Sequence, residues 1–173
     1  MSNDKNVKVI NVSNNELPKY ETPLSAGMDV RVDFSRVHEH PIKVYGDGNY
    51  VPATEVQKTN CLYLEPFSRA LIPTGLFMAI PEGYEIQIRP RSGLALKEGI
   101  TMANCIGTID ADYRNEVGII VINLSNKVVC IEDGERIGQL VLNKVDKINW
   151  KEVSHISELG DTERKGGFGS TGK

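Results

Sequence analysis

Two carboxylates, a tyrosine and an arginine stand together directly before an apolar, strand-like run. They are Asp110, Asp112, Tyr113 and Arg114, and the apolar run covers residues 117–124. Because side chains alternate along an extended chain, Asp110, Asp112 and Arg114 are expected to share one face. Neighbouring carboxylates repel each other unless a cation intervenes, so Arg114 can neutralise Asp112 and leave Asp110 for chemistry. A salt bridge on a solvated strand end is the alternative interpretation.

A cation also precedes a predicted helix at residues 92–99. Ser92 suits the N-cap, and Gly99 suits the position after the last helical residue. The first N–H groups of a helix bind anions, and Arg91 adds a guanidinium that fits phosphate. The segment therefore predicts a phosphate site made by Arg91, Ser92 and Gly93. An ordinary capped helix beside a surface arginine is the alternative.

The glycine-rich residues 160–173 show no apolar periodicity and contain one aromatic residue, Phe168. Such a composition predicts a mobile tail. Backbone N–H groups of a flexible ribbon can form a nest around phosphate, so the tail could close over such a ligand. A disordered end is the alternative, and it leaves the single phenylalanine unexplained.

Composition limits the classes of function. The chain has 173 residues, enough for one domain with a core. Its formal net charge of −3 argues against bulk binding of nucleic acid or membrane, so an anionic ligand needs a local site. The sequence contains neither an apolar run that spans a membrane nor an apolar signal core near residue 1.

The cysteines and histidines offer little chemistry of their own. Cys61, Cys105 and Cys130 are scattered without a Cys-x-x-Cys motif, which favours reduced thiols and a cytoplasmic protein. His38 and His40 could pair on a strand face as metal ligands, but no further ligand pattern lies nearby. Exposed histidines are the better interpretation.

Short apolar runs between turn signals predict an all-β sandwich or barrel. The runs cover residues 7–12, 28–34, 69–74, 76–80, 84–89, 117–124, 127–131 and 137–145. The run 117–124 is continuously apolar, which predicts burial on both faces. Residues 35–60 interrupt the pattern and are expected to form an insertion with its own hairpin, turning at Asp47-Gly48. We interpret 1–159 as one β domain, followed by the tail.

Five segments match, in order, the motifs of a known family. They are AGMDV (26–30), PRSGLA (90–95), GTIDADYRNEV (107–117), RIGQL (136–140) and GGFGSTG (166–172). With these motifs the chain resembles the trimeric dUTP pyrophosphatases, or dUTPases, over nearly its whole length. The resemblance implies a jelly-roll-like β-barrel with one short helix, assembled as a homotrimer. It also implies active sites built from several subunits, each closed by a neighbour's tail.

The activity implied by the resemblance is hydrolysis of dUTP to dUMP and pyrophosphate. Water attacks the α-phosphorus in line, assisted by Mg²⁺ that the triphosphate chelates. The reaction limits uracil in DNA and supplies dUMP for dTMP synthesis. A small-molecule nucleotide and two further copies of the chain are the expected partners, without direct binding of nucleic acid or membrane.

Family roles transfer to single positions of this sequence. Asp110 resembles the carboxylate that orients and deprotonates the attacking water, and Tyr113 resembles the tyrosine against the deoxyribose. Asn104 resembles the asparagine that reads the uracil edge, and Phe168 the aromatic that stacks on uracil. Asp29 resembles the acid that touches water around Mg²⁺. The other implied substrate contacts are the hairpin residues Gly107, Thr108 and Ile109, the phosphate contacts Arg91, Ser92, Gly93 and Gln139, and the tail residues Arg164, Gly169, Ser170 and Thr171.

Three positions depart from the family pattern. Asn115 stands where glycine is usual, and asparagine tolerates left-handed backbone geometry. Gly138 stands where alanine is usual, a small residue for a small residue. The fifth motif is one residue shorter, because Arg164 lies four residues before Phe168. Either Arg164 or Lys165 could therefore meet the γ-phosphate, and Arg164 is favoured.

Two other functions are compatible with the same fold. A dCTP deaminase would place a glutamate and a water at the cytosine amine, but Tyr113 and the tail favour the pyrophosphatase. A regulatory nucleotide-binding protein would use the fold without turnover. The presence of Asp110, Ser92 and Phe168 speaks against a loss of catalysis.

Overall fold

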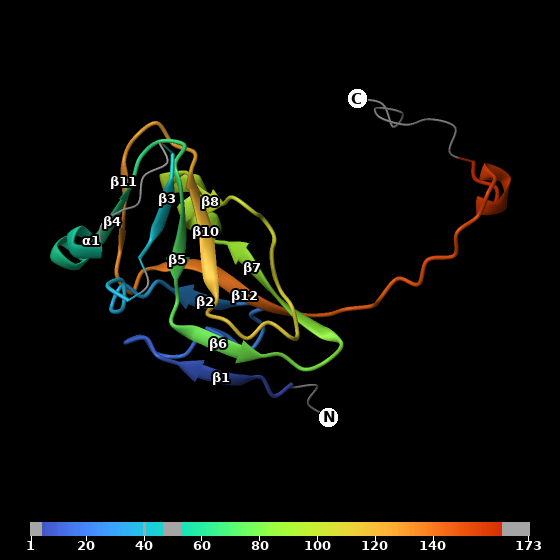
Figure 1. The fold of residues 1–173 in the computed structure, drawn as a ribbon, viewed down its shortest axis with the longest axis horizontal. Coiled ribbons are helices and arrows are strands. Elements are labelled where there is room, and N and C mark those ends of the chain that lie inside the picture. The colour runs from blue at the N-terminus through green and yellow to red at the C-terminus, as the bar shows by residue number, and fades with distance from the viewer. Residues whose placement is uncertain (1–4, 40, 47–52, 164–173) are drawn as a thin grey trace.

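The computed structural model describes residues 5–39, 41–46 and 53–163. Short strands form the body, and after the last strand the chain leaves it as an extended arm (Figure 1). The all-β class is confirmed. In chain order the elements are β1 Lys8–Asn11, β2 Met28–Arg31, β3 Lys43–Tyr45, α1 Ala53–Thr59, β4 Cys61–Leu64, β5 Arg69–Pro73, β6 Leu76–Ala79, β7 Tyr84–Pro90, α2 Ser92–Glu98, β8 Ile100–Met102, β9 Gly107–Ile109, β10 Gly118–Asn123, β11 Val129–Glu132, β12 Arg136–Lys144 and the 3₁₀ helix η1 Ile156–Leu159.

The strands form two four-stranded sheets and two pairs. One large sheet has the order β3-β5-β10-β8 and the other β2-β12-β7-β9, while β1 pairs with β6 and β4 with β11. All of these pairings are antiparallel. Across the described residues the pairings do not close into a barrel, which corrects the expected closed barrel.

Each apolar run of the sequence overlaps one strand of the structure, but the burial of β10 differs from expectation. Its side chains alternate: Ile119, Val121 and Asn123 are buried, whereas Ile120 and Ile122 are only half-buried. The prediction of burial on both faces was therefore wrong. Period-two alternation of burial is typical of an antiparallel strand with one face on the core.

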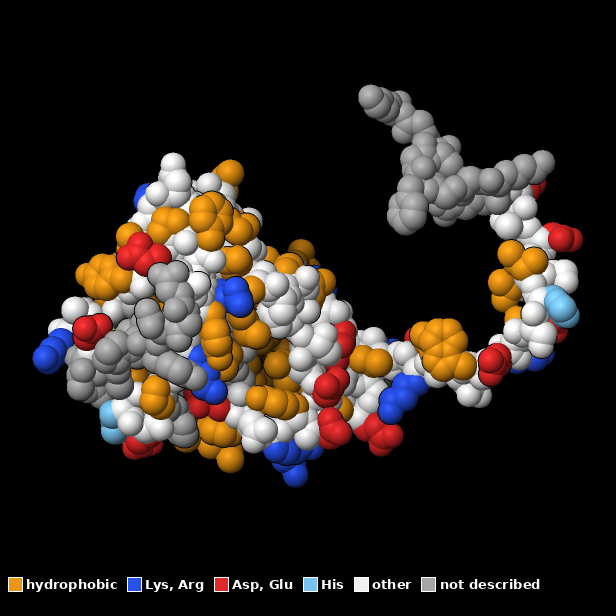
Figure 2. Space-filling model, turned by 45° about the horizontal axis from the view of Figure 1, so that its top comes forward, with side chains coloured by type: hydrophobic (Ala, Val, Ile, Leu, Met, Phe, Trp, Pro, Cys, Tyr) orange, Lys and Arg blue, Asp and Glu red, His pale blue; other side chains and the backbone are white. Residues whose placement is uncertain are grey.

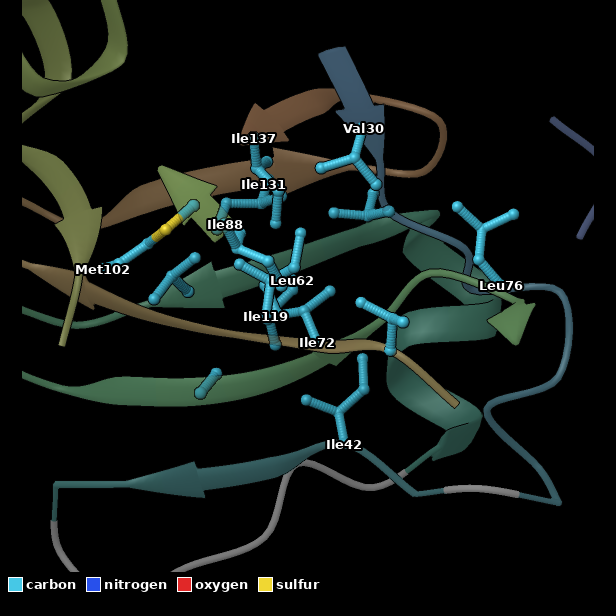
Figure 3. Packing of buried hydrophobic residues seen from close by; sticks show 14 of the residues in the cluster. Val30, Ile42, Leu62, Ile72, Leu76, Ile88, Met102, Ile119, Ile131 and Ile137 are labelled. Carbon is cyan, nitrogen blue, oxygen red and sulfur yellow. The ribbon is translucent and has the colours of Figure 1, made fainter. Parts of the chain in front are cut away.

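The core lies between the two large sheets. Val30, Ile88 and Ile137 of one sheet face Ile72 and Ile119 of the other (Figure 3). Each is at most 3% exposed. Burying an aliphatic side chain of this size contributes about 1.5–3 kcal/mol, so these contacts hold the sheet that carries the sequence motifs in place.

The helices differ from the single helix that was expected. Helix α2 is present, but Arg91 is its N-cap and Ser92 its first residue, which corrects the predicted cap. Gly99 ends the helix at φ +71°, a backbone conformation that favours glycine, and its N–H donates to the carbonyl of Leu94. Helix α1 and η1 are additional.

Among its described residues, the segment 35–60 forms no hairpin of its own. Its strand β3 pairs with β5, and the residues before β4 form helix α1 instead of a returning strand. The proposed turn at Asp47-Gly48 lies outside the described residues. The segment thus extends a large sheet at its edge, as Figure 1 shows.

The cysteines also differ from expectation. Cys61 and Cys130 form a disulfide between the paired strands β4 and β11. Cys105 is free and exposed. The expectation of reduced thiols at all three positions was therefore wrong, because two residues far apart in sequence become neighbours across strands. Separately, no helix in the described part of the chain has the length and apolar character needed to cross a membrane.

Two asparagines offer a matched test of the fold. The buried amide of Asn123 donates to the carbonyls of Leu64 and Lys127 at 2.9 and 2.8 Å. The buried Nδ2 of Asn143 has no hydrogen-bond partner within the described residues. Asn123→Ala leaves two carbonyls unpaired and should lower the free energy of unfolding by about 2–4 kcal/mol, against less than ~1 kcal/mol for Asn143→Ala.

Urea unfolding measures both changes, at one fixed protein concentration because the stability of any chain that assembles depends on concentration. Equal losses for the two variants would contradict the assignment of Asn123 as a structural hydrogen-bond donor.

Candidate active site

The sheet β2-β12-β7-β9 gathers four of the five motifs. AGMDV (26–30) leads into β2, RIGQL (136–140) opens β12, PRSGLA (90–95) follows β7, and GTIDADYRNEV (107–117) begins with β9. Their order in space is therefore first, fourth, second and third. The fifth motif lies outside the described residues, as do the predicted contacts Arg164, Lys165, Phe168, Gly169, Ser170 and Thr171.

Strand β12 brings three of these motifs together by its register. Gln139 pairs with Asp29 of β2 on one side and with Arg89 of β7 on the other. The pairing with β2 shifts between Arg136 and Gly138. This shift is a β-bulge or a similar irregularity, and bulges redirect side chains. Arg136 lies on the other side of the shift from Gln139, and its side chain contacts Asp29.

Asp29 is held by two arginines. The Nε of Arg91 donates to its Oδ1 at 3.1 Å, and the Nη1 of Arg136 lies 3.2 Å from its Oδ2. Arg91 Nη1 also donates to the carbonyl of Arg136 at 2.9 Å. Within the described residues no contact engages the Nη2 of Arg91, which leaves this nitrogen available to an anion. Sequence reasoning missed Arg136, although it opens the RIGQL motif.

Gln139 lies where the first, second and fourth motifs meet. Its Nε2 donates to the carbonyl of Pro90 at 3.1 Å, and a Cβ at Gly27 would come within 2.7 Å of its Oε1. The unusual Gly138 also has a packing reason. A Cβ there would lie 2.6 Å from the terminal methyl of Met102, so the methionine fills the space that an alanine would need.

The predicted phosphate contacts lie together at this end of the sheet. Arg91 directly follows β7, and Gln139 lies in β12, the strand that pairs with β7. Arg91 donates to the carbonyl of Arg136, and Gln139 donates to the carbonyl of Pro90. Ser92 and Gly93 are exposed at the start of α2. A Cβ at Gly93 would meet nothing within 4 Å, so the chain presents an open backbone there.

The third motif forms a turn, not an extended strand. Strand β9 ends at Ile109, and the N–H of Tyr113 donates to the carbonyl of Asp110 at 3.1 Å. Arg114 donates to the carbonyls of Ala111 and Tyr113, and within the described residues it forms no ion pair with Asp112. The expected shared face and the Arg114–Asp112 pair were therefore wrong. The turn leaves Asp110 exposed.

Strand β9 is the edge strand of its sheet. It pairs only with β7 among the described residues, so the other edge presents backbone N–H and C=O groups. The predicted hairpin residues Gly107, Thr108 and Ile109 make up this strand. Asn104 is exposed, and its Nδ2 lies 3.5 Å from the position of a Cβ at Gly107.

The predicted catalytic and phosphate residues of one chain do not meet. Ile109 pairs with Ile86, near the start of β7, whereas Arg91 directly follows the end of that strand. Asp110 and Arg91 are therefore separated by roughly 15–20 Å of extended strand. An open cleft of about 610 Å³ lies beside Asp110, lined also by Glu85 and Lys147.

Metal ligands are sparse in the part of the chain described. No group of three His, Cys, Asp or Glu side chains there could hold a metal ion. His38 instead lies 3.4 Å from Glu39, and His40 falls outside the described residues.

Comparisons with known proteins agree on one family. The dUTPase family model matches residues 55–172. The chain is 51% identical over 168 residues to the deoxyuridine 5'-triphosphate nucleotidohydrolase of Fusobacterium nucleatum subsp. nucleatum, covering 96% of this chain and 97% of that protein. It is 49% identical over 166 residues to the protein of the same name from Finegoldia magna, covering 96% and 98%.

A solved structure shares the fold. It is the Staphylococcus bacteriophage 80alpha dUTPase with dUpNHpp, with a TM-score of 0.72 and 24% identity over 98% of this chain and 100% of that chain. The family match covers most of the described body, and the curated relatives cover nearly the whole chain. The protein therefore belongs to the dUTPase family of enzymes.

Proposed function

We propose that the protein hydrolyses dUTP to dUMP and pyrophosphate, which limits uracil in DNA and supplies dUMP for dTMP synthesis. Two relatives that align with this chain over nearly their whole length are named for this activity. This naming does not favour a deaminase or a purely regulatory role. The observation that carries the proposal is Asp110, which stands exposed beside a cleft at the end of the edge strand β9.

Asp110 is proposed as the general base. Its carboxylate takes a proton from a water molecule, whose oxygen forms a bond to the α-phosphorus as the bond to pyrophosphate breaks. A positioned base of this kind contributes typically ~10²–10⁴-fold to the rate. Phosphoryl transfer requires little covalent chemistry of the protein, so the placement of water and nucleotide dominates.

Recognition of the base and sugar falls to the hairpin around β9. The outer edge of β9 offers backbone donors and acceptors in a fixed pattern, and Asn104 lies over its start. Uracil and cytosine present opposite groups to such an edge, so a fixed pattern rejects cytosine. Tyr113 lies against the deoxyribose and excludes a 2′-hydroxyl sterically. A merely apolar pocket would reject an added hydroxyl by only ~10²-fold.

The triphosphate is proposed to bind at the other end of the sheet. Arg91 offers its Nη2, Ser92 and Gly93 offer an open backbone, and Gln139 still has a second amide hydrogen beside the one donated to Pro90. Asp29 holds Arg91 in place for this contact, at 3.1 Å.

Asp29 fits the predicted role around Mg²⁺ through water. Both of its oxygens are held by guanidinium groups, and each oxygen keeps a lone pair that can accept from a water molecule. Bound Mg²⁺ commonly keeps several waters and takes its other ligands from substrate phosphates. It would supply charge screening of the triphosphate and of the leaving pyrophosphate.

The separation of the two half-sites supports the proposal of a homotrimer with shared active sites. Asp110 of one chain needs Arg91 of another, because one strand cannot bring both to the same phosphate. The arm after β12 supports this proposal, since Figure 2 shows hydrophobic side chains exposed along it. They are Ile148, Trp150, Ile156 and Leu159, each at least 73% exposed. The residues 160–173 then close over a neighbour's site, with Phe168 on the uracil and Arg164, Ser170 and Thr171 at the phosphates.

Asp110→Asn tests the base. The variant should bind dUTP, because the amide keeps the shape of the side chain, yet lose nearly all turnover. Pyrophosphate release at saturating dUTP measures turnover, and calorimetry with a non-hydrolysable analogue measures binding. A variant that keeps a tenth of the wild-type rate would refute the assignment.

Truncation after Gly160 tests the tail. The shortened chain should keep its circular dichroism and melting temperature but lose most of its dUTP hydrolysis, because the phosphates stay open to water. Full activity in the truncated chain would remove the role of the tail in closure.

A further inference from the structure

Arg36 belongs to the insertion, yet its side chain contacts the third motif. Its Nη2 donates to Oε1 of Glu116 at 2.9 Å, and its Nε lies 3.6 Å from Oδ2 of Asp33. The side chains of Arg36 and Glu116 are only 20% and 17% exposed. The guanidinium therefore joins the first residues of the insertion to the end of the turn that carries Asp110.

Burial explains why Arg36 keeps this position. The side chain of Asp33 is 1% exposed, and a buried carboxylate is costly unless a cation or hydrogen bonds compensate its charge. Its Oδ1 accepts the N–H and the hydroxyl of Ser35, and the guanidinium of Arg36 faces its Oδ2. Two carboxylates thus contact Arg36, Asp33 at its Nε and Glu116 at its Nη2.

Glu116 passes this constraint to the backbone of the motif. The oxygen that accepts from Arg36 also accepts the N–H of Gly75 at 2.7 Å. At the next residue, the N–H of Val117 donates to the carbonyl of Leu76, and its carbonyl accepts the hydroxyl of Thr74 at 2.6 Å. Residues 116 and 117 are therefore clamped onto the turn between β5 and β6.

The position of the Tyr113 side chain depends on the same contacts of Glu116. Its hydroxyl donates to the backbone carbonyl of Glu116 at 2.9 Å. Its ring is partly exposed, at 37%, so this hydrogen bond and the turn closed on Asp110 determine where the ring lies. Arg36 holds the side chain of Glu116, and Glu116 holds the side chain of Tyr113.

We propose that Arg36 is a positioning residue for Tyr113 and thereby for the discrimination between deoxyribose and ribose. The inference rests on the proposed function, in which Tyr113 lies against the sugar. Without Arg36, the carboxylate of Glu116 loses its cation and faces the buried Asp33. It then turns toward solvent and moves the carbonyl that anchors the tyrosine hydroxyl.

Arg36→Met tests the proposal, because methionine keeps the apolar stem and removes the charge. The ratio of kcat/KM for UTP to kcat/KM for dUTP should rise by ~10–100-fold, the scale of an ångström-sized misplacement. Arg36→Lys should restore part of the selectivity, since it retains a cation. Arg69→Met is the matched control, because it removes a surface guanidinium that stacks on Tyr45, 5.7 Å from the ring centroid, and should leave the ratio unchanged.

A double-mutant cycle separates positioning from general destabilisation. Tyr113→Phe keeps the ring but removes the hydroxyl anchor, so it should relax selectivity as Arg36→Met does. Combining the two substitutions should add little, because both act on one chain of contacts. Fully additive effects, or an unchanged ratio in a folded Arg36→Met variant, would overturn the proposal.

Hydrogen exchange provides a readout that does not require turnover. In Arg36→Met the amides of Gly75 and Tyr113 should exchange faster than in the wild type, while those of the distant pair β4 and β11 should not. Should Arg36→Met fail to fold, Glu116→Gln replaces it, because it removes the charge that pairs with Arg36. The amide oxygen can still accept from Gly75, so in this variant the faster exchange is expected at Tyr113. Unchanged exchange would overturn the proposed role of Arg36, whether or not the wild type hydrolyses dUTP. A wild type that hydrolysed no dUTP would refute the proposed function separately.

Discussion

The pairing of β12 on both of its edges is the constraint on which the candidate site depends. It fixes Gln139 between Asp29 and Arg89, and thereby sets three motifs side by side. If the pairing of β12 slipped by one residue, its two faces would be exchanged and the buried side chain of Leu140 would face the solvent. The hydrophobic core therefore protects the register, and the register places the two arginines around Asp29.

The length of β7 has the opposite effect, because it separates Asp110 from Arg91, two residues that the proposed reaction needs at one substrate. The strand runs from the turn of Asp110 at one end to Arg91 at the other. Under the proposed mechanism, a single chain would carry a half-site for the base and the water and a separate half-site for the phosphates, too far apart to serve one nucleotide. The proposed mechanism therefore requires assembly, and the exposed apolar side chains of the arm are the surface proposed for it.

The sequence predicted the strands whose apolar runs are long enough to show a pattern, such as β10 and β12. It did not predict β3 or β8, because three residues carry no periodicity. The motifs indicated which residues gather at the sheet, because the resemblance to the dUTPases assigns them to one site, although their order in space differs from their order along the chain. The sequence did not reveal Arg136 on Asp29, Arg36 on Glu116 or the disulfide, because each joins segments that only the sheet pairing brings together. The extended reading of 110–114 failed since aspartate also favours turns.

Complementation between two inactive chains tests the shared site most directly. Asp110→Asn and Arg91→Met chains, each confirmed to fold and to have the mass of about three 19.1 kDa chains, are unfolded, mixed in equal amounts and refolded together. If Asp110 and Arg91 of different chains form one site, roughly a quarter of the sites combine two intact residues, and dUTP hydrolysis returns to about that fraction of the wild type. If each chain forms its own site, the mixture stays as inactive as its parents, which would contradict the account.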